Sequence, residues 1–295
     1  MDCEVSSLFY DEEYDVVYGF VEEDRRYRQN DQEKKSFYVE ESLTCSPLIL
    51  MQSEECLSLM IEKECEHMPA ADYFQRLTNG DLDIGARDEI LQWIVKVHSH
   101  FKFGPMCAYL CVNYLDRFLS VSNLPKDKVW MMQLLGVACF SLSVKMEETV
   151  PSCLDLQVAG DAKFVFEVTT IQRMERLVLS SLNWRMQAIT PFSFMDYFLK
   201  KINGNQIVSI NQSVQLILST LRELHLLKFK PSEIAAAVAI IVATGVKTET
   251  GNSEKAIPAL VQHVQEEKVM KCIELIRKSS VPQSSSDSLD ATSLR

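Results

Sequence analysis

Two pairs of side chains stand at a spacing that could bring metal ligands together. Cys107 and Cys111 are four residues apart and would share one face of a helix, as two thiolate ligands of a zinc ion would. No further Cys or His stands at ligand spacing near them, so the sequence favours small core residues over a metal site. His98 and His100 are two residues apart and would point to different faces of a helix. We therefore expect neither a metal ion nor a cofactor.

Motifs for enzymatic chemistry are missing from the rest of the chain. The sequence has no GxGxxG dinucleotide motif, no phosphate-binding loop, no HExxH zinc motif and no GxSxG nucleophile motif. Asn211-Gln-Ser fits a glycosylation sequon, but nothing else indicates secretion. The sequence therefore gives no residue on which an enzymatic function could be based.

The net charge limits the class of binding partner, and the cysteine content indicates the redox compartment. The net charge is −11, and a nucleic-acid surface would be basic, so we expect no binding to DNA or RNA. The nine cysteines form no CxxC pair, and no signal peptide opens the chain. We therefore expect free thiols in a reducing compartment rather than disulfide bonds.

Most of the negative charge lies near the N-terminus. Thirteen acidic and five basic residues precede Leu50, and this segment shows little helical periodicity. Such a composition is typical of disordered interaction tails. We expect a disordered acidic arm over residues 1–52 and a short, disordered, Ser-rich tail over residues 279–295.

The longest apolar run spans Val129–Met146 and carries no charge before Lys145. A helix that is apolar on every side is either a membrane span or the centre of a helical core. A span needs about 20 apolar residues, and Gln133, Gly136 and Ser141 interrupt this run. We therefore expect a central core helix and no membrane span.

The remaining pattern predicts an all-α chain, because amphipathic runs outnumber alternating ones and Gly and Pro are few. A second all-round apolar run, IAAAVAIIVATGV, suggests a second unit built around its own middle helix, and residues 148–160 are expected to form a loop. On the first two helices the residues expected inside are Leu57, Met60, Ile61 and Cys65, then Ile90, Leu91, Ile94, Val95 and Val97. Besides the central helix, the predicted helices are Ser53–Glu66, Arg87–Phe101, Met106–Leu119, Val168–Leu182, Pro191–Ile202, Gln206–Leu226, Pro231–Val246 and Ser253–Lys278.

Four segments, taken in order, carry a family resemblance. They are RDEILQWIVKVHSHF, AYLCVNYLDRFLS, MQLLGVACFSLSVKMEE and ERLVLSSLNWRMQAITPFSFMDYF. Together they resemble a D-type cyclin, most similar to those of plants, over about residues 54–277. The resemblance implies two tandem five-helix cyclin folds, an N-terminal cyclin box over 53–188 and a C-terminal fold over 189–278. It also implies a non-catalytic subunit that binds and activates a cyclin-dependent Ser/Thr kinase and promotes G1/S progression.

The resemblance assigns a kinase-contact role to two residues. In the family, a Lys at the end of the central helix and a Glu on the fifth helix contact the kinase beside its mobile regulatory helix. By position these are Lys145 and Glu175. From the residues alone, Lys145 equally fits a cation at the C-terminus of its own helix, and Glu175 fits a solvated face.

The family's substrate-docking groove lies on the first core helix. Three positions depart from its pattern: Ala86 stands where Met is usual, Glu89 where an aliphatic residue is usual, and Lys96 where an acid is common. Arg87 and Trp93 could also be purely structural, so binding of basic-aliphatic motifs stays open. The positions that match the groove are Arg87, Ile90, Trp93 and Gln133.

D-type cyclins usually carry an early Leu-x-Cys-x-Glu motif that binds retinoblastoma-type proteins. Leu8, Tyr10 and Glu12 stand at the right place, but Tyr10 replaces the Cys. The segment Leu43–Pro47 keeps the Cys and has Pro where Glu belongs. Neither copy is intact, so a retinoblastoma-type partner is not expected to bind well.

Three points remain as expectations. No basic cluster typical of a nuclear import signal is present, so we expect the protein in nucleus and cytoplasm, with nuclear residence dependent on the partner. The kinase would form a heterodimer with the chain, and kinase inhibitor proteins are a further class of partner left open. The alternatives to a cell-cycle cyclin are a transcription-associated cyclin, a cyclin-fold scaffold, or a D-type relative without retinoblastoma binding.

Overall fold

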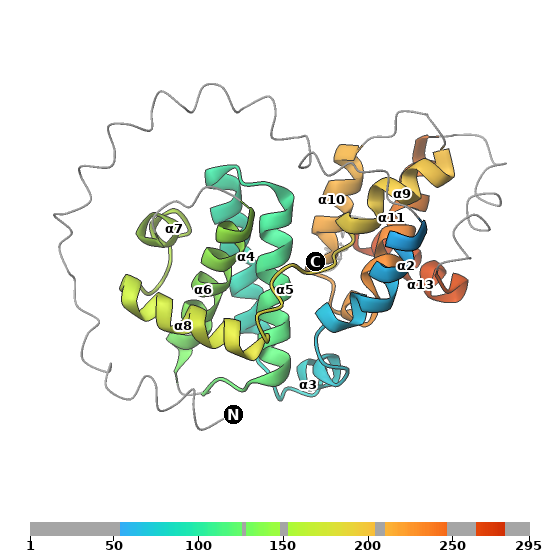
Figure 1. Cartoon of the computed structure of the whole chain (residues 1–295). Coiled ribbons are helices and arrows are strands. Elements are labelled where there is room, and N and C mark those ends of the chain that lie inside the picture. The colour runs from blue at the N-terminus through green and yellow to red at the C-terminus, as the bar shows by residue number, and fades with distance from the viewer. Residues whose placement is uncertain (1–53, 126–127, 148–152, 204–209, 247–263, 281–295) are drawn as a thin grey trace, which may run out of the picture.

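The computed structural model describes residues 54–125, 128–147, 153–203, 210–246 and 264–280. Within these ranges the regular structure is entirely helical and falls into two units side by side (Figure 1). The helices of the first unit are α4 (Ile84–Phe101), α5 (Pro105–Val121), α6 (Val129–Glu147), α7 (Cys153–Ala159) and α8 (Val168–Ser181). Those of the second are α9 (Phe192–Asn203), α10 (Ile210–Thr220), η3 (Leu224–Lys228), α11 (Pro231–Val246) and α13 (Glu266–Ser280). Before them come α2 (Glu54–Lys63), η2 (Glu64–His67) and α3 (Tyr73–Thr78).

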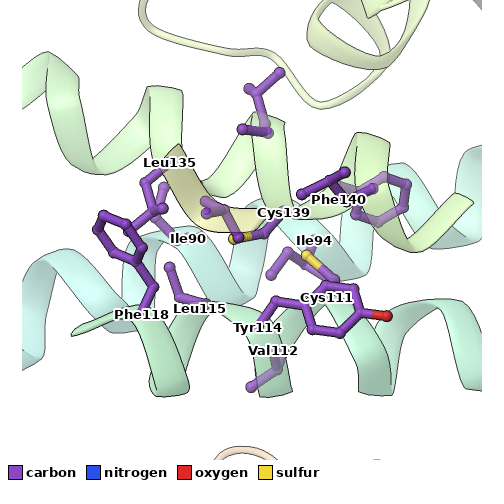
Figure 2. Packing of buried hydrophobic residues seen from close by; sticks show 14 of the residues in the cluster. Ile90, Ile94, Cys111, Val112, Tyr114, Leu115, Phe118, Leu135, Cys139 and Phe140 are labelled. Atoms are coloured by element: carbon purple, nitrogen blue, oxygen red, sulfur yellow. The ribbon is translucent and has the colours of Figure 1, made fainter. Parts of the chain in front are cut away.

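Helix α6 is the centre of the first unit. Among the described residues it is the helix that is long and apolar enough to cross a membrane by composition alone, but other helices cover most of its length. It packs against α5, α8, α4 and α7. Figure 2 shows Leu135, Cys139 and Phe140 of α6 meeting side chains of α4 and α5. The predicted core helix is therefore confirmed, and its apolar character reflects burial in protein.

Local signals set the ends of α4 and α5. The Asp83 side chain accepts a hydrogen bond from the Ala86 amide at 2.9 Å, which caps the start of α4 and places that start three residues before the predicted Arg87. Lys102 ends the helix in a left-handed conformation with φ 55°, and its amide donates to the His98 carbonyl. Pro105 then occupies the first turn of α5, where its missing N–H costs nothing.

Helix α11 has the same central role in the second unit. Its residues Ala235–Ala239 have no exposed surface, and the small side chains let neighbouring helices approach closely. It packs against α9, α13 and α10. The two units touch through partly buried leucines of α10, of η3 and of the turn between them, which pack on the first core: Leu218, Leu221, Leu224 and Leu227.

Helix α2 precedes the first unit in sequence but packs on the second. Leu57 is fully buried in the second core, with Met60 and Ile61 packed against it. Glu54 lies near Lys201 of α9, with 3.6 Å between Oε1 and Nζ. Figure 1 shows α2 beside α9, α11 and α13.

Several expected elements differ in the structure. Val95 is 46% exposed, because the buried stripe of α4 follows Ile90, Leu91, Ile94 and Val97 and Val95 falls outside it. Cys65 is exposed, and its neighbour Glu64 is buried in its place.

The connections also contain more helix than expected. The expected loop 148–160 holds α7, and the approach to α4 holds α3. The helix expected over Gln206–Leu226 ends at Thr220, and Glu223 then starts η3 by accepting from the His225 amide. The predicted acidic arm, the Ser-rich tail and the expected N-cap Ser53 lie outside the described residues.

Candidate functional site

Lys145 and Glu175 form an ion pair between α6 and α8. The Lys145 ammonium lies 2.6 Å from each carboxylate oxygen of Glu175. The Glu175 side chain is 8% exposed, while that of Lys145 is 40% exposed. An ammonium has three N–H donors and Glu175 accepts from it twice, so one donor can face a partner. The two predicted contact residues therefore meet in one place, with only the lysine open to solvent.

Exposed apolar side chains occur on the same two elements, directly after Lys145 and just beyond the end of α8. Met146 follows Lys145 directly and is 38% exposed. Leu179 lies one turn beyond Glu175 on α8, and its carbonyl accepts a hydrogen bond from the Trp184 amide at 2.9 Å. Trp184 is 71% exposed and has a positive φ of 59°. The backbone after α8 thus holds an indole ring in solvent.

Arg87, predicted as a docking residue, is buried and fully engaged. Its Nε and Nη2 donate to the two oxygens of Asp116 on α5 at 2.7 and 2.8 Å, and Nη2 also reaches the Leu221 carbonyl at 3.3 Å. The Tyr73 hydroxyl donates to the same carboxylate at 2.7 Å. Burial by itself would lower the pKa of Arg87, but the Asp116 carboxylate raises it above its ordinary value. Arg87 therefore braces α4, α5, α3 and the inter-unit link, and its 2% exposure leaves no surface for a ligand.

The three other predicted docking residues lie together and are also covered. Ile90 is 5% exposed and packs against Gly136, where a Cβ would lie 2.7 Å from its Cγ2. Trp93 is 6% exposed and packs edge-on against Phe140. The side-chain amide of Gln133 is bonded to the backbone of Phe164: it donates to the Phe164 carbonyl at 2.7 Å and accepts from the Phe164 N–H at 3.2 Å. Docking at this face stays a prediction.

The departures from the groove pattern have partners of their own. Glu89 pairs with Lys163 at 2.8 Å, and Lys96 lies 3.8 Å from Asp161. Both pairs are exposed and join α4 to the segment before α8. The sequence pattern did not predict the packing of this segment, because its partners are up to 74 residues away along the chain. The one available signal was the recurrence of apolar residues at alternate positions, Ala162, Phe164 and Phe166.

The cysteine pair belongs to the core. Cys107 and Cys111 are both fully buried, and Cys107 Sγ lies 3.6 Å from the Ser143 hydroxyl. Burial raises the pKa of the Cys111 thiol well above its ordinary value, which opposes formation of a thiolate ligand. Within the described ranges no three His, Cys, Asp or Glu residues cluster around a possible metal position. The degenerate retinoblastoma motif Leu8, Tyr10 and Glu12 lies outside the described residues.

Comparison with known proteins covers both units. The cyclin N-terminal domain matches residues 55–187, and the cyclin C-terminal domain matches residues 189–293. The fold is similar to the X-ray structure of a viral cyclin from herpesvirus saimiri, with a TM-score of 0.55, 16% identity, and coverage of 67% of this chain and 85% of the viral one.

Sequence relatives are similar over most of the chain. Cyclin-D4-2 of Oryza sativa subsp. japonica is 50% identical over 232 residues, which is 77% of this chain and 60% of the rice protein. Cyclin-D4-1 of the same organism is 47% identical over 264 residues, 81% of this chain and 71% of the relative. Cyclin-D4-1 of Arabidopsis thaliana is 47% identical over 233 residues, with 76% and 74% covered. The chain therefore belongs to the cyclins, the family of regulatory subunits of cyclin-dependent kinases, and within that family to the D-type cyclins of plants.

Proposed function

We propose that the surface around Lys145 and Glu175, together with Met146, binds and activates a cyclin-dependent kinase and that the chain has no catalytic activity of its own. The observation that carries the proposal is the half-exposed Lys145 ammonium, held by a buried carboxylate and followed directly by the exposed Met146. Aromatic residues and Met are enriched in protein interfaces, where they supply the apolar contact around a few fixed polar groups. Early cell-cycle progression is the process this activity would serve.

The chain would activate the kinase by holding a mobile helix of the kinase in position. Kinase activity requires an ion pair between a strand lysine and a glutamate on a mobile helix of the kinase. A partner that binds the inward position of that helix shifts the kinase towards the active state. On this surface the free N–H of Lys145 would bind a backbone carbonyl of the kinase helix, and the aligned Glu175 keeps the ammonium in place.

A charge swap tests this role and separates it from stability. Lys145→Glu alone would place two carboxylates together, one of them buried, and so it would destabilise the first unit. The double variant Lys145→Glu with Glu175→Lys restores an ion pair in reversed order. We expect the double variant to melt close to wild type while binding the kinase at least about tenfold more weakly, as expected for loss of about 1.4 kcal/mol.

The experiment is a titration of purified kinase with each variant, with phosphorylation of a short Ser-Pro peptide as a second measurement. Exposed Val95→Ser on α4 serves as the control, because it changes an apolar side chain away from the ion pair. Wild-type affinity in the double variant would show that the pair is only structural. Phosphoryl transfer by the purified chain without kinase would contradict the non-catalytic assignment.

A further inference from the structure

Two neighbouring residues of α5 carry opposite charges, and both are buried. Asp116 is 2% exposed and accepts from Nε and Nη2 of Arg87 at 2.7 and 2.8 Å. Arg117 is 5% exposed, yet both of its acceptors are neutral: the Asn113 side chain at 3.3 Å and the Arg185 carbonyl at 2.9 Å. Buried charges are ordinarily paired with opposite charges. Arg117 is therefore a buried cation without an acidic partner among the described residues.

The guanidinium of Arg117 has more donors than the structure uses. Both of its hydrogen bonds come from Nη1, whereas a guanidinium also carries N–H donors on Nε and Nη2. Within the described ranges, Nε and Nη2 are not among the side-chain atoms that lack both a partner and contact with solvent. These two nitrogens therefore have no acceptor but keep some contact with solvent, so a small ligand can reach them.

Two further side chains lie close to Arg117. Burial lowers the pKa of Arg117 to about 10; Tyr114 opposes the shift, and the positive charge of Arg185 adds to it. The Nδ1 atom of His67 is buried and has no hydrogen-bond partner among the described residues. Asn113 joins His67 to Arg117, because its Nδ2 donates to the His67 carbonyl at 2.9 Å while its Oδ1 accepts from Arg117. Three elements, η2, α5 and the segment after α8, thus bring one imidazole and two guanidinium groups together.

The acidic groups beside this cluster do not balance its charge. Glu66 lies 3.0 Å from Nη1 of Arg185, but both side chains of this pair are about half exposed, and such a contact holds its partners only weakly. Asp116 precedes Arg117 in sequence, but both of its oxygens accept from Arg87. The charge of the Arg117 guanidinium is therefore left for a ligand to neutralise.

We propose that Arg117, Arg185 and His67 form a binding site for a phosphate group, either the free ion or a phosphorylated side chain of a protein partner. Arginine donates to phosphate through paired N–H groups, and such charge-assisted hydrogen bonds are about twice as strong as neutral ones. A phosphate has several strong acceptor oxygens, so one group can accept from all three side chains, including Nδ1 of His67 when that nitrogen carries hydrogen. The site uses neither Lys145 nor Glu175, so it does not depend on the proposed function.

The test measures phosphate binding to the full chain at constant ionic strength. The probes are inorganic phosphate and the peptide acetyl-Gly-Gly-phosphoserine-Gly-Gly-amide, with the unphosphorylated peptide as a blank. Arg185→Gln removes a half-exposed guanidinium of the site. Arg176→Gln is the matched control, because it removes the same charge from an exposed position on α8 whose hydrogen bond is to the Gln172 carbonyl. We expect Arg185→Gln to bind phosphate about tenfold more weakly than wild type, as for loss of one hydrogen bond to a charged group, and Arg176→Gln to bind like wild type.

Nitrogen-15 NMR of the arginine side chains shows where the phosphate binds. The Nε–H signal of Arg117 should shift as phosphate is added, with the same half-saturation as the binding curve. Tighter binding of the phosphopeptide would identify a phosphorylated protein segment as the ligand, and tighter binding of inorganic phosphate would identify the free ion. The proposal would be overturned by the absence of saturable binding of both probes, by equal affinities of wild type and Arg185→Gln, or by an Arg117 signal that does not move. No kinase is present in these titrations, so failure of the proposed function would leave their result unchanged.

Discussion

At the residue scale, the buried carboxylates of this protein join segments that are far apart in sequence. Asp116 accepts from Arg87, 29 residues away, and from Tyr73, 43 residues away. Glu64 accepts from the amide and hydroxyl of Ser232, both at 2.8 Å and 168 residues away. A buried charge is tolerated only when such partners surround it, so each carboxylate fixes the geometry of the elements that supply its donors.

The first prediction concerns Arg87. Arg87→Leu would leave the Asp116 carboxylate buried with Tyr73 as its remaining side-chain donor. Breaking a buried pair in this way costs about 3–5 kcal/mol, a large part of the roughly 5–15 kcal/mol by which domains are stable. Urea unfolding followed by tryptophan fluorescence measures it, because the three tryptophans of the chain all precede residue 188. Lys96→Leu, which removes an exposed contact on the same helix, should cost less than about 1 kcal/mol; equal losses would show that the Arg87 network adds nothing.

At the element scale, α6 packs as a core helix because the neighbouring helix α4 can approach its backbone. Gly136 stands where Ile90 of α4 comes closest, and an added Cβ would lie 2.7 Å from Ile90 Cγ2. Ile90 is buried on every side, so its side chain has little freedom to move away. The glycine therefore sets the distance between α4 and α6.

The second prediction compares two helical glycines. Gly136→Ala should destabilise the first unit by about 1–3 kcal/mol, because overpacking a filled core forces shifts. Gly245→Ala, in α11 with nothing within 4 Å of the added Cβ, should stabilise the second unit by about 0.5–1 kcal/mol. Thermal melts by circular dichroism measure both changes. A stabilised Gly136→Ala would mean that α4 and α6 can separate without cost.

The 3-10 helix η2 holds two titratable groups with opposite shifts. Burial lowers the pKa of His67 below 6.5, and the positive charges of Arg117 and Arg185 add to the effect while Glu66 opposes it. Burial raises the pKa of Glu64 above 4.5, although Ser232 and Lys230 favour its charged form. The contribution of Glu64 to stability is therefore greatest below pH 4.5 and falls as the pH rises.

The third prediction uses the His67 shift. The unfolded chain takes up a proton near pH 6.5, and the folded chain does so only at lower pH, so stability falls as the pH drops below about 6.5. His67→Gln removes this proton uptake. We expect wild type to lose more stability than His67→Gln between pH 7 and pH 5, measured as the change in urea midpoint. Parallel pH curves for the two proteins would show that His67 has an ordinary pKa.

At the scale of the whole molecule, sequence patterns predicted the elements whose position depends only on being buried on every side. The all-round apolar runs predicted both middle helices, and α6 ends one residue beyond its predicted end at Met146. Patterns did not show which elements meet, so three features came only from the structure: the Lys145–Glu175 pair, the hydrogen bonds of Gln133 to Phe164, and the burial of Arg87. Helix α7 escaped prediction because it is short and follows Pro151, whose presence favours a loop.

Helix α2 packs with the second unit although it precedes the first unit in sequence. Leu57 lies in the second core with no exposed surface, and Glu64 binds the first turn of α11 through Ser232. Both contacts bind the segment before the first unit to the second unit. The stability of the second unit therefore depends on residues that precede the first unit, and we expect loss of α2 to destabilise the second unit.

The last prediction tests this dependence with two probes. Leu57→Asp places an unpaired carboxylate in the second core, which costs several kcal/mol. Tryptophan fluorescence reports the first unit, because Trp93, Trp130 and Trp184 all belong to it, whereas circular dichroism reports the helices of both. We expect the dichroism melt of Leu57→Asp to begin well below that of wild type while the fluorescence melt moves much less. Leu59→Asp on the same helix is the control, since Leu59 is 56% exposed and should leave both melts unchanged. If both signals of Leu57→Asp fell together, α2 would support the two units equally, and the inter-unit leucines of α10 and η3 would have to transmit the damage from one core to the other.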